Sequence, residues 1–282
     1  MVAYVRLLRL KHWIKNGLLW IPLFMNVQRW QGTVLVQLML SFVAFSLLAS
    51  MVYVLNDFHD KAEDAKHPLK KNRPFPSGQV KTTVAGWLCL GLLVGAVALL
   101  RLVYLATGQP LVWILPLLYV LNNLLYVYKL RGLPFWDVSS IGLGFVLRLS
   151  LGSVVAGVVL SPWLGLSVFG FACYMGYSKR QGEFQLRDRR PVLARYGREQ
   201  LHLATYLSLG VGIGAYGLWA LSSRYSLLVV STLLIILPVS YRYDALFKQV
   251  DHPDPTLILL ADKRLQGLCL LYLAMLVVIF NH

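Results

Sequence analysis

A run of acidic side chains at residues 56–64 has the types and spacing that metal chemistry needs. It reads Asn56-Asp57-Phe58-His59-Asp60-Lys61-Ala62-Glu63-Asp64. If this segment continues as a helix, Asp57, Asp60 and Asp64 share one face at i, i+3 and i+7, and Asn56 lies beside Asp60. Three carboxylates repel one another, and Mg²⁺ prefers a few carboxylates together with substrate phosphate oxygens. The spacing therefore predicts a Mg²⁺ site; a solvated acidic helix end balanced by nearby lysines is the alternative.

A basic segment follows the acidic run directly. It reads His67-Pro68-Leu69-Lys70-Lys71-Asn72-Arg73-Pro74 and ends in a predicted turn at Pro76-Ser77-Gly78. A metal–diphosphate complex needs acids to hold the metal and Lys or Arg to neutralise the remaining phosphate charge. The two segments together predict a site for a diphosphate substrate, and a juxtamembrane lipid-binding patch is the alternative.

Long apolar stretches must position these groups. The chain is 57% hydrophobic and only 14% charged, whereas soluble domains are about 25% charged. A membrane crossing needs about 20 apolar residues. Nine stretches are predicted: 14–30, 33–55, 83–106, 111–128, 138–160, 162–178, 201–222, 225–241 and 265–281. We expect an all-α integral membrane bundle of about nine transmembrane helices, forming a single domain over residues 1–282, with a retained N-terminus.

The charged residues predict the orientation of this bundle. All but four of the 27 Lys and Arg precede the first predicted helix or follow an even-numbered one. The positive-inside rule then places the N-terminus and these loops in the cytoplasm and the C-terminus outside. All 12 Asp and Glu fall on the same side, although acids contribute little to orientation. This distribution predicts a functional site facing the cytoplasm at the inner membrane.

The net charge of +15 has two interpretations: an anionic leaflet at the surface, or anionic substrates in a pocket. Nucleic-acid binding is disfavoured, because the basic residues lie in short loops on a membrane body. A transporter is disfavoured as well, because the second half of the chain shows no equivalent of the acidic run.

Several single residues are weaker candidates. Arg148 lies inside the predicted helix 138–160, where an arginine is costly. Its partner is either a substrate phosphate or, as a structural alternative, a carbonyl or tyrosine. Tyr126 contacts ribose or belongs to an interfacial aromatic belt.

The acidic pattern N-D-x-x-D-x-x-x-D followed by H-P-x-K-x-x-R-P resembles the UbiA superfamily of membrane prenyltransferases, and within it the branch of polyprenyl-phosphate phosphoribosyltransferases. The resemblance spans nearly the whole chain. Further matches are Trp13-Ile14-Lys15-Asn16, residues 126–131, Asp137-Val138, residues 144–148, Lys179-Arg180-Gln181-Gly182-Glu183 and Asp262-Lys263-Arg264. The matched Asp137 and Asp262 either belong to the site or only orient nearby cations.

The resemblance implies a UbiA-type helical bundle and an Mg²⁺-dependent reaction. In that reaction a polyprenyl (decaprenyl) phosphate attacks C1 of phosphoribosyl diphosphate and releases diphosphate, which in some bacteria leads to a cell-wall arabinose donor. The alternative is transfer of a prenyl group from a prenyl diphosphate to an aromatic acceptor. Ordinary aromatic prenyltransferases carry a second acidic motif, D-x-x-x-D, after the sixth helix. This chain has Lys179 and Arg180 there instead, which favours the more highly charged phosphoribosyl substrates.

The expected site residues fall into three groups. Asp57, Asp60 and Asp64 are expected to bind the metal and to be catalytic. The residues expected at substrate phosphates are Lys15, Asn16, Lys66, Lys70, Arg73, Lys129, Arg131, Arg148, Lys179 and Arg180. Further site residues are Asn56, Tyr126 and Glu183. The expected partners are phosphoribosyl diphosphate, a polyprenyl phosphate lipid and the membrane; a homo-oligomer is left open.

Overall fold

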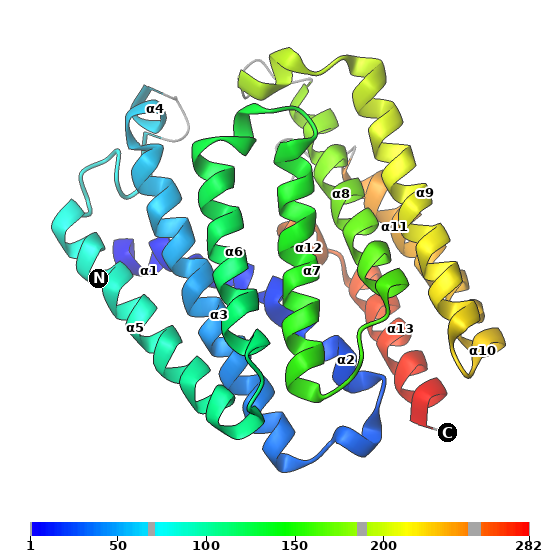
Figure 1. Cartoon of the computed structure of the whole chain (residues 1–282). Coiled ribbons are helices and arrows are strands. Elements are labelled where there is room, and N and C mark those ends of the chain that lie inside the picture. Colours follow the sequence, from blue (N-terminus) through cyan, green and yellow to red (C-terminus); the bar gives the residue numbers. More distant parts are fainter. Residues whose placement is uncertain (1, 67–70, 185–190, 248–254, 282) are drawn as a thin grey trace.

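The computed structural model describes residues 2–66, 71–184, 191–247 and 255–281, which form helices and no strand. The first half contains α1 (Val2–Leu8), η1 (Leu10–Trp20), α2 (Ile21–Phe24), η2 (Val27–Arg29), α3 (Gly32–His59), α4 (Lys61–Lys66), α5 (Thr82–Thr107), α6 (Leu111–Tyr128) and η3 (Leu130–Gly132). The second half contains α7 (Trp136–Ala156), α8 (Pro162–Phe184), η4 (Pro191–Arg195), α9 (Arg198–Ser222), α10 (Ser226–Ser231), α11 (Leu233–Phe247), α12 (Pro255–Ala261) and α13 (Lys263–Asn281). Figure 1 shows the bundle from the side.

Seven membrane-spanning candidates occur in the part of the chain that the structure describes. They are α3, α5, α6, α7, α9, α13 and the segment Ser226–Phe247, which α10 and α11 share. These seven agree with seven of the nine predicted stretches. The predicted stretch 162–178 forms most of the 23-residue helix α8, which is less apolar than the spanning candidates because it contains several glycine, serine and tyrosine residues and ends in charged ones. The prediction of an all-α membrane bundle is confirmed, but the count of nine crossings is not.

The first predicted stretch, 14–30, is wrong as a single helix. It is divided among the 3₁₀ helix η1, the four-residue helix α2 and the short η2. Pro22 lies in the first turn of α2, where a residue without an N–H is tolerated, whereas within a continuous helix it would remove a backbone hydrogen bond. The buried side chain of Asn16 also lies inside this segment, so the segment carries a polar group into the bundle.

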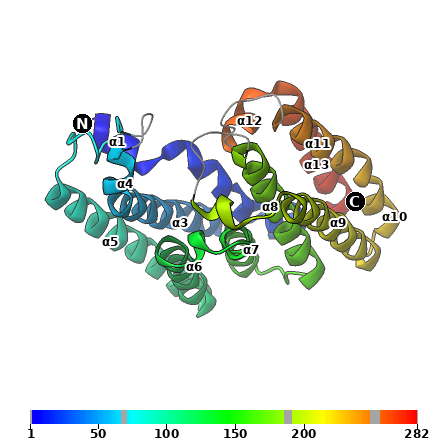
Figure 2. The ribbon, with the colours of Figure 1, turned by 90° about the horizontal axis from the view of Figure 1, so that it is seen from above.

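Neighbouring helices pack in chain order. α3 packs against α5, α6 against α7, α7 against α8, and α8 against α9, while α11 packs against α13. From above, α8, α9 and α11 to α13 lie on one side and α3 to α6 on the other (Figure 2). α3 and α7 are the most buried spans, with 61% of each apolar window inside the protein, compared with 17% for α13. The outer helices therefore expose apolar side chains, as a lipid-facing surface requires.

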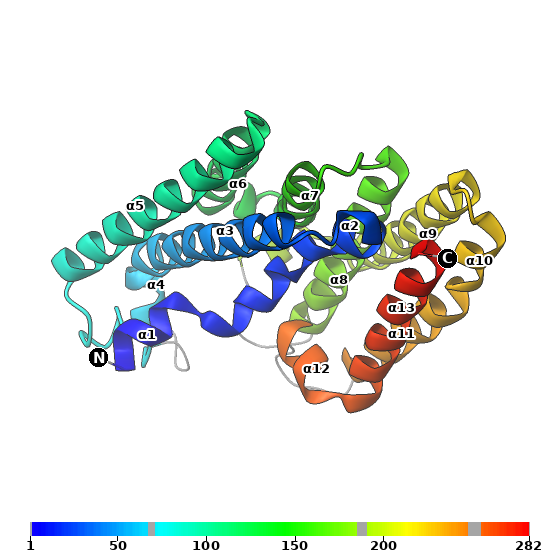
Figure 3. The ribbon, with the colours of Figure 1, turned by 90° about the horizontal axis from the view of Figure 1, so that it is seen from below.

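The 3₁₀ helix η1 runs against both central helices, α3 and α7. Seen from below, it crosses the bundle toward α2 (Figure 3). The approach to α7 is close at Gly152, where an added Cβ would stand 2.1 Å from the carbonyl oxygen of Leu19. α7 ends at Ala156, and Gly157, which follows it, has a φ of 63° that suits a glycine at a helix C-terminus. The lack of a side chain at Gly152 thus allows η1 to pack closely against α7.

Candidate active site

The acidic segment lies where α3 ends, near the upper end of the bundle in Figure 1. α3 stops at His59, and the new helix α4 begins at Lys61. Asp60 stands between them with ψ near −1°. The N–H groups of Asp60 and Asp64 still donate to the carbonyls four residues earlier, at 3.0 Å and 2.8 Å. The expectation that the segment continues as a helix therefore holds apart from the interruption at Asp60, and the placing of all three carboxylates on one face stays a prediction. Separate arginines pair with different carboxylates of the segment, which offsets the repulsion among them.

Asp57 and Asp64 share one cation. The side chains of both carboxylates are buried, with 7% and 5% exposed. Arg73 Nη1 lies 2.7 Å from Asp64 Oδ2 and 3.9 Å from Asp57 Oδ1. Arg9, at the start of η1, forms a second ion pair with Asp57. Two buried carboxylates within reach of the same positive group have the donor atoms and the charge that Mg²⁺ prefers, so this pair fits a metal ion.

Asp60 belongs to a different ion pair. It pairs with Arg131 of η3, whose Nη2 also lies 3.3 Å from Glu63 Oε2. Asn56 Nδ2 donates to Asp60 Oδ2 at 3.5 Å, as the i, i+4 spacing predicted. Within the described ranges, no group of three or more His, Cys, Asp or Glu side chains is placed to hold a metal ion. Coordination by all three aspartates therefore stays a prediction.

The basic segment after α4 is described in part. Its predicted turn is present, because the Ser77 N–H donates to the Arg73 carbonyl at 3.0 Å and the Gly78 N–H to the Phe75 carbonyl at 3.1 Å. Lys66 is exposed at the end of α4. The predicted phosphate ligand Lys70 lies outside the described residues. Of the two predicted cations that the structure describes here, Lys66 and Arg73, it is Arg73 that contacts the carboxylates.

A second charged cluster surrounds Arg180 near the end of α8. Arg180 Nε donates to Asp137 Oδ2 at 2.7 Å, and its Nη1 donates to Glu183 Oε2 at 3.0 Å. The Arg180 and Asp137 side chains are 3% and 0% exposed. Asp137 thus orients a cation, one of the two roles weighed for it from sequence. Lys179 precedes Arg180 on α8, and Tyr126 of α6 is close enough to interact electrostatically with Arg180.

Tyr196 completes this cluster, and sequence analysis missed it. Its hydroxyl donates to Asp137 Oδ1 at 2.6 Å and accepts the Phe135 N–H at 2.6 Å. Burial, together with the adjacent Asp137 carboxylate, raises the pKa of Tyr196 well above its ordinary value. Phe135 has a φ of 68°, a strained backbone that occurs often at functional sites. No local motif marks Tyr196, because its partner lies 59 residues away.

η3 connects the two clusters. Arg131 in η3 contacts Asp60, and the carbonyl of Gly132 accepts a hydrogen bond from Arg195 Nη1 at 2.9 Å. η3 follows α6 and leads into α7, which carries Asp137 in its first turn. Lys129 is exposed at the end of α6. The short connection between α6 and α7 therefore holds groups from both clusters at one end of the bundle.

Arg148 is buried in α7 with neutral partners. Its Nε donates to Asn16 Oδ1 at 2.7 Å, Nη1 to the Gly144 carbonyl at 2.6 Å, and Nη2 to the Tyr119 hydroxyl at 3.1 Å. The guanidinium carbon also lies 5.1 Å from the ring centroid of Phe45. These contacts match the structural alternative weighed from sequence. A phosphate contact of Arg148 stays a prediction, as does that of Lys15, which precedes Asn16 on η1.

Arg9 is the second residue that sequence analysis did not place at the site. It was counted among the basic residues before the first predicted helix and interpreted as a topology signal alone. The structure pairs it with Asp57, and its guanidinium lies 5.1 Å from the ring centroid of Tyr53. Its φ of 48° turns the chain sharply between α1 and η1. The turn brings η1 back against α3, which is what joins Arg9 to the acidic segment.

The fold and the site define a multi-pass helical membrane protein whose buried carboxylates and arginines meet at one end of the bundle. Residues 18–261 match the UbiA prenyltransferase family, and the chain belongs to that family. The resemblance inferred from the acidic and basic motifs is thereby confirmed.

Two relatives and one solved structure extend this comparison. The decaprenyl-phosphate phosphoribosyltransferase of Corynebacterium glutamicum is 30% identical over 94% of this chain and 83% of its own length. The protein of the same name from Mycolicibacterium smegmatis is 32% identical over 77% of this chain and 70% of its own. A UbiA homolog from Archaeoglobus fulgidus, bound to DMAPP and Mg²⁺, has a TM-score of 0.74 at 16% identity over 99% of each chain. That structure establishes the shared fold.

Proposed function

We propose that this protein transfers the 5-phosphoribosyl group of phosphoribosyl diphosphate to a polyprenyl phosphate and releases diphosphate. The observation that carries the proposal is the buried Arg180 near the end of α8, held by Asp137 and Glu183. Ordinary aromatic prenyltransferases would have a second pair of aspartates there. The relatives named as decaprenyl-phosphate phosphoribosyltransferases support the same activity.

The charge of the substrates explains why cations suit this position. Phosphoribosyl diphosphate brings a diphosphate and a 5-phosphate, and the acceptor lipid brings a further phosphate. An oxygen of the acceptor phosphate attacks C1, the bond from C1 to the diphosphate oxygen breaks, and diphosphate leaves with the electron pair. Because the acceptor phosphate is already ionised near neutral pH, the reaction needs no general base. Positioning and charge neutralisation by the protein are then the main requirements.

The carboxylates and arginines of the acidic segment have complementary roles in this proposal. Asp57, Asp60 and Asp64 would hold Mg²⁺, and the metal would supply positive charge to the departing diphosphate. Arg9 and Arg73 pair with Asp57 and Asp64 in the present structure. With a metal bound at these carboxylates, the two guanidinium groups would be available to the phosphate oxygens, which arginine binds in a bidentate manner.

The membrane and the charge distribution set where the reaction occurs. The polyprenyl chain of the acceptor stays in the bilayer, while the phosphates reach the charged end of the bundle. By the positive-inside rule this end faces the cytoplasm, so we place the site on the cytoplasmic side of the inner membrane. The water-soluble donor then enters from the compartment in which activated sugars are made.

The test uses the full chain purified in detergent with Mg²⁺, radiolabelled phosphoribosyl diphosphate and a polyprenyl phosphate. We expect label in the lipid phase, and we expect it to disappear with EDTA and with Asp57→Ala. Glu199→Ala is the matched control, because Glu199 is an exposed acid in the first turn of α9 and should leave turnover unchanged. Normal turnover by a folded Asp57→Ala protein would refute the role of the acidic segment.

Prenyl transfer to an aromatic acceptor is the second candidate. The observation that favours it is the shared fold with a UbiA homolog bound to DMAPP and Mg²⁺. The same preparation should be incubated with a prenyl diphosphate and an aromatic acid. Prenylation of the acid, without transfer of label from phosphoribosyl diphosphate, would assign the protein to this activity instead.

A further inference from the structure

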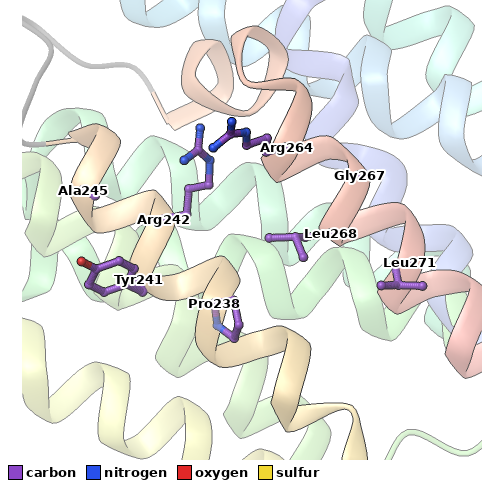
Figure 4. Close-up of a pocket in the computed structure, with 8 residues that line it drawn as sticks. All are labelled: Pro238, Tyr241, Arg242, Ala245, Arg264, Gly267, Leu268 and Leu271. Carbon is purple, nitrogen blue, oxygen red and sulfur yellow. The ribbon is translucent and has the colours of Figure 1, made fainter.

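An open groove lies between α11 and α13, away from the candidate active site. It has a volume of about 550 Å³, and its lining includes Pro238, Arg242, Arg264, Gly267, Leu268 and Leu271. Arg242 and Arg264 lie side by side at one end, and Leu268 and Leu271 follow along α13 (Figure 4). The groove therefore has a cationic end and an apolar body.

The apolar body faces the region that lipid occupies. Both walls belong to membrane-spanning candidates, Ser226–Phe247 and Lys263–Phe280. On α13, Leu271 in the groove and the adjacent Leu270 are 51% and 67% exposed. Exposed leucines on a spanning helix contact hydrocarbon chains, because they have no favourable alternative within the bilayer.

Two arginines and one aspartate set the charge at the cationic end of the groove. Arg242 is bound by Asp262, with Nε 3.0 Å from Oδ1 and Nη2 2.6 Å from Oδ2. Asp262 therefore neutralises Arg242 and fixes its guanidinium at the groove. Among the residues that the structure describes, Arg264 has no carboxylate within salt-bridge distance. The three side chains together carry a net charge of about +1 at neutral pH.

We propose that this groove binds an anionic phospholipid of the surrounding bilayer, with its phosphate at Arg242 and Arg264 and an acyl chain along Leu268 and Leu271. A phosphodiester headgroup carries a single negative charge, which matches the charge of the cationic end. A phosphomonoester such as polyprenyl phosphate carries nearly two, which this end would neutralise only in part. The lipid site is separate from the acidic segment and does not depend on the transfer reaction.

Gly267 provides a way to block the groove without disturbing the fold. A Cβ added there meets no atom within 4 Å, so a larger side chain projects into the groove. Replacing a helical glycine also favours the helix. Gly267→Leu should therefore fold and fill the apolar body. Gly210→Leu is the matched control, because Gly210 lies on α9, is exposed and has equally open space around it.

The experiment is native mass spectrometry of the delipidated full chain in detergent, titrated with phosphatidylglycerol, phosphatidylcholine or decaprenyl phosphate. We expect the wild type to bind phosphatidylglycerol more tightly than phosphatidylcholine. Arg264→Gln should weaken phosphatidylglycerol binding about fivefold, as expected for one interfacial cation, and Gly267→Leu should weaken binding of this lipid. Gly210→Leu and Arg198→Gln, which removes an exposed arginine at the start of α9, should bind as the wild type does.

Two results would overturn the proposal. If Arg264→Gln and Gly267→Leu bind phosphatidylglycerol like their controls, the groove is not a site for this lipid. If the two variants lose decaprenyl phosphate but keep phosphatidylglycerol, the groove serves the acceptor lipid instead. Thermal unfolding of each variant establishes that it is folded before the titration. Phosphoribosyl transfer is measured separately, so failure of the lipid site is distinguishable from failure of the proposed activity.

Discussion

Replacing Asp137 with asparagine should separate Arg180 from its closest partner. The substitution keeps the shape of the side chain and an oxygen that can accept the Tyr196 hydroxyl, but removes the charge. Arg180 is 3% exposed and Asp137 is fully buried, so water cannot replace the lost carboxylate. The guanidinium then retains Glu183 as its remaining carboxylate partner among the described residues.

The expected loss follows from burial. Removing one member of a buried ion pair costs about 3–5 kcal/mol of stability. We expect a loss near the lower end of this range, because Glu183 still pairs with Arg180. A loss of about 3 kcal/mol lowers the melting temperature of a chain of this size by roughly 6–12 °C. Glu183→Gln is the comparison, because Glu183 is 15% exposed and its loss leaves Asp137 in place. We expect about 1 kcal/mol or less for that variant.

Two measurements test this reasoning in detergent. Thermal unfolding gives the loss of stability. If the proposed function is correct, KM for phosphoribosyl diphosphate reports whether Arg180 binds the substrate. We expect Asp137→Asn to lower the melting temperature and to raise KM more than Glu183→Gln does. A melting temperature within about 2 °C of wild type, less than one kcal/mol, would show that Asp137 does not hold Arg180. A lower melting temperature with unchanged KM would limit the pair to a structural role.

Three further predictions concern packing, pH and Arg148. Gly152→Ala should destabilise by about 1–3 kcal/mol, because its Cβ would stand 2.1 Å from the Leu19 oxygen; Gly91→Ala, in open space on α5, should not. Hydrogen bonds from Arg242 and the Leu265 N–H lower the pKa of Asp262 to about 2, below about 3.9 in the unfolded chain. The ionised Asp262 therefore stabilises the folded protein fully above about pH 4. The wild type should melt at a higher temperature than Asp262→Asn there, and this difference should vanish as the pH falls through about 2. Arg148→Met should lower the free energy of unfolding by about 1–3 kcal/mol, since Asn16 and Tyr119 lose a hydrogen-bond partner. If Arg148 also contacts a substrate phosphate, calorimetric titration of this variant with phosphoribosyl diphosphate should show weaker binding than the wild type.

The sequence by itself determined the class of fold and most of the residue types at the site. Hydropathy is a local property, so seven spanning candidates could be located from composition and length. The acidic and basic segments are also local, and Asn56 contacts Asp60 as i, i+4 spacing requires. Residues 14–30 do not form the single helix that was predicted, because average hydropathy over this segment does not reveal the buried Asn16 or the break before Pro22.

Only the tertiary structure decided which charges meet. Arg9 reaches Asp57 across 48 residues, Arg131 reaches Asp60 across 71, and Arg148 reaches Asn16 across 132. Such contacts depend on how η1, η3 and α7 pack against α3, and neither spacing nor hydropathy encodes that packing. A buried charge requires a partner, and the packing determines which group lies close enough to be that partner. The sequence therefore shows that Asp57, Asp60 and Arg148 need partners, and the packing of distant segments selects them.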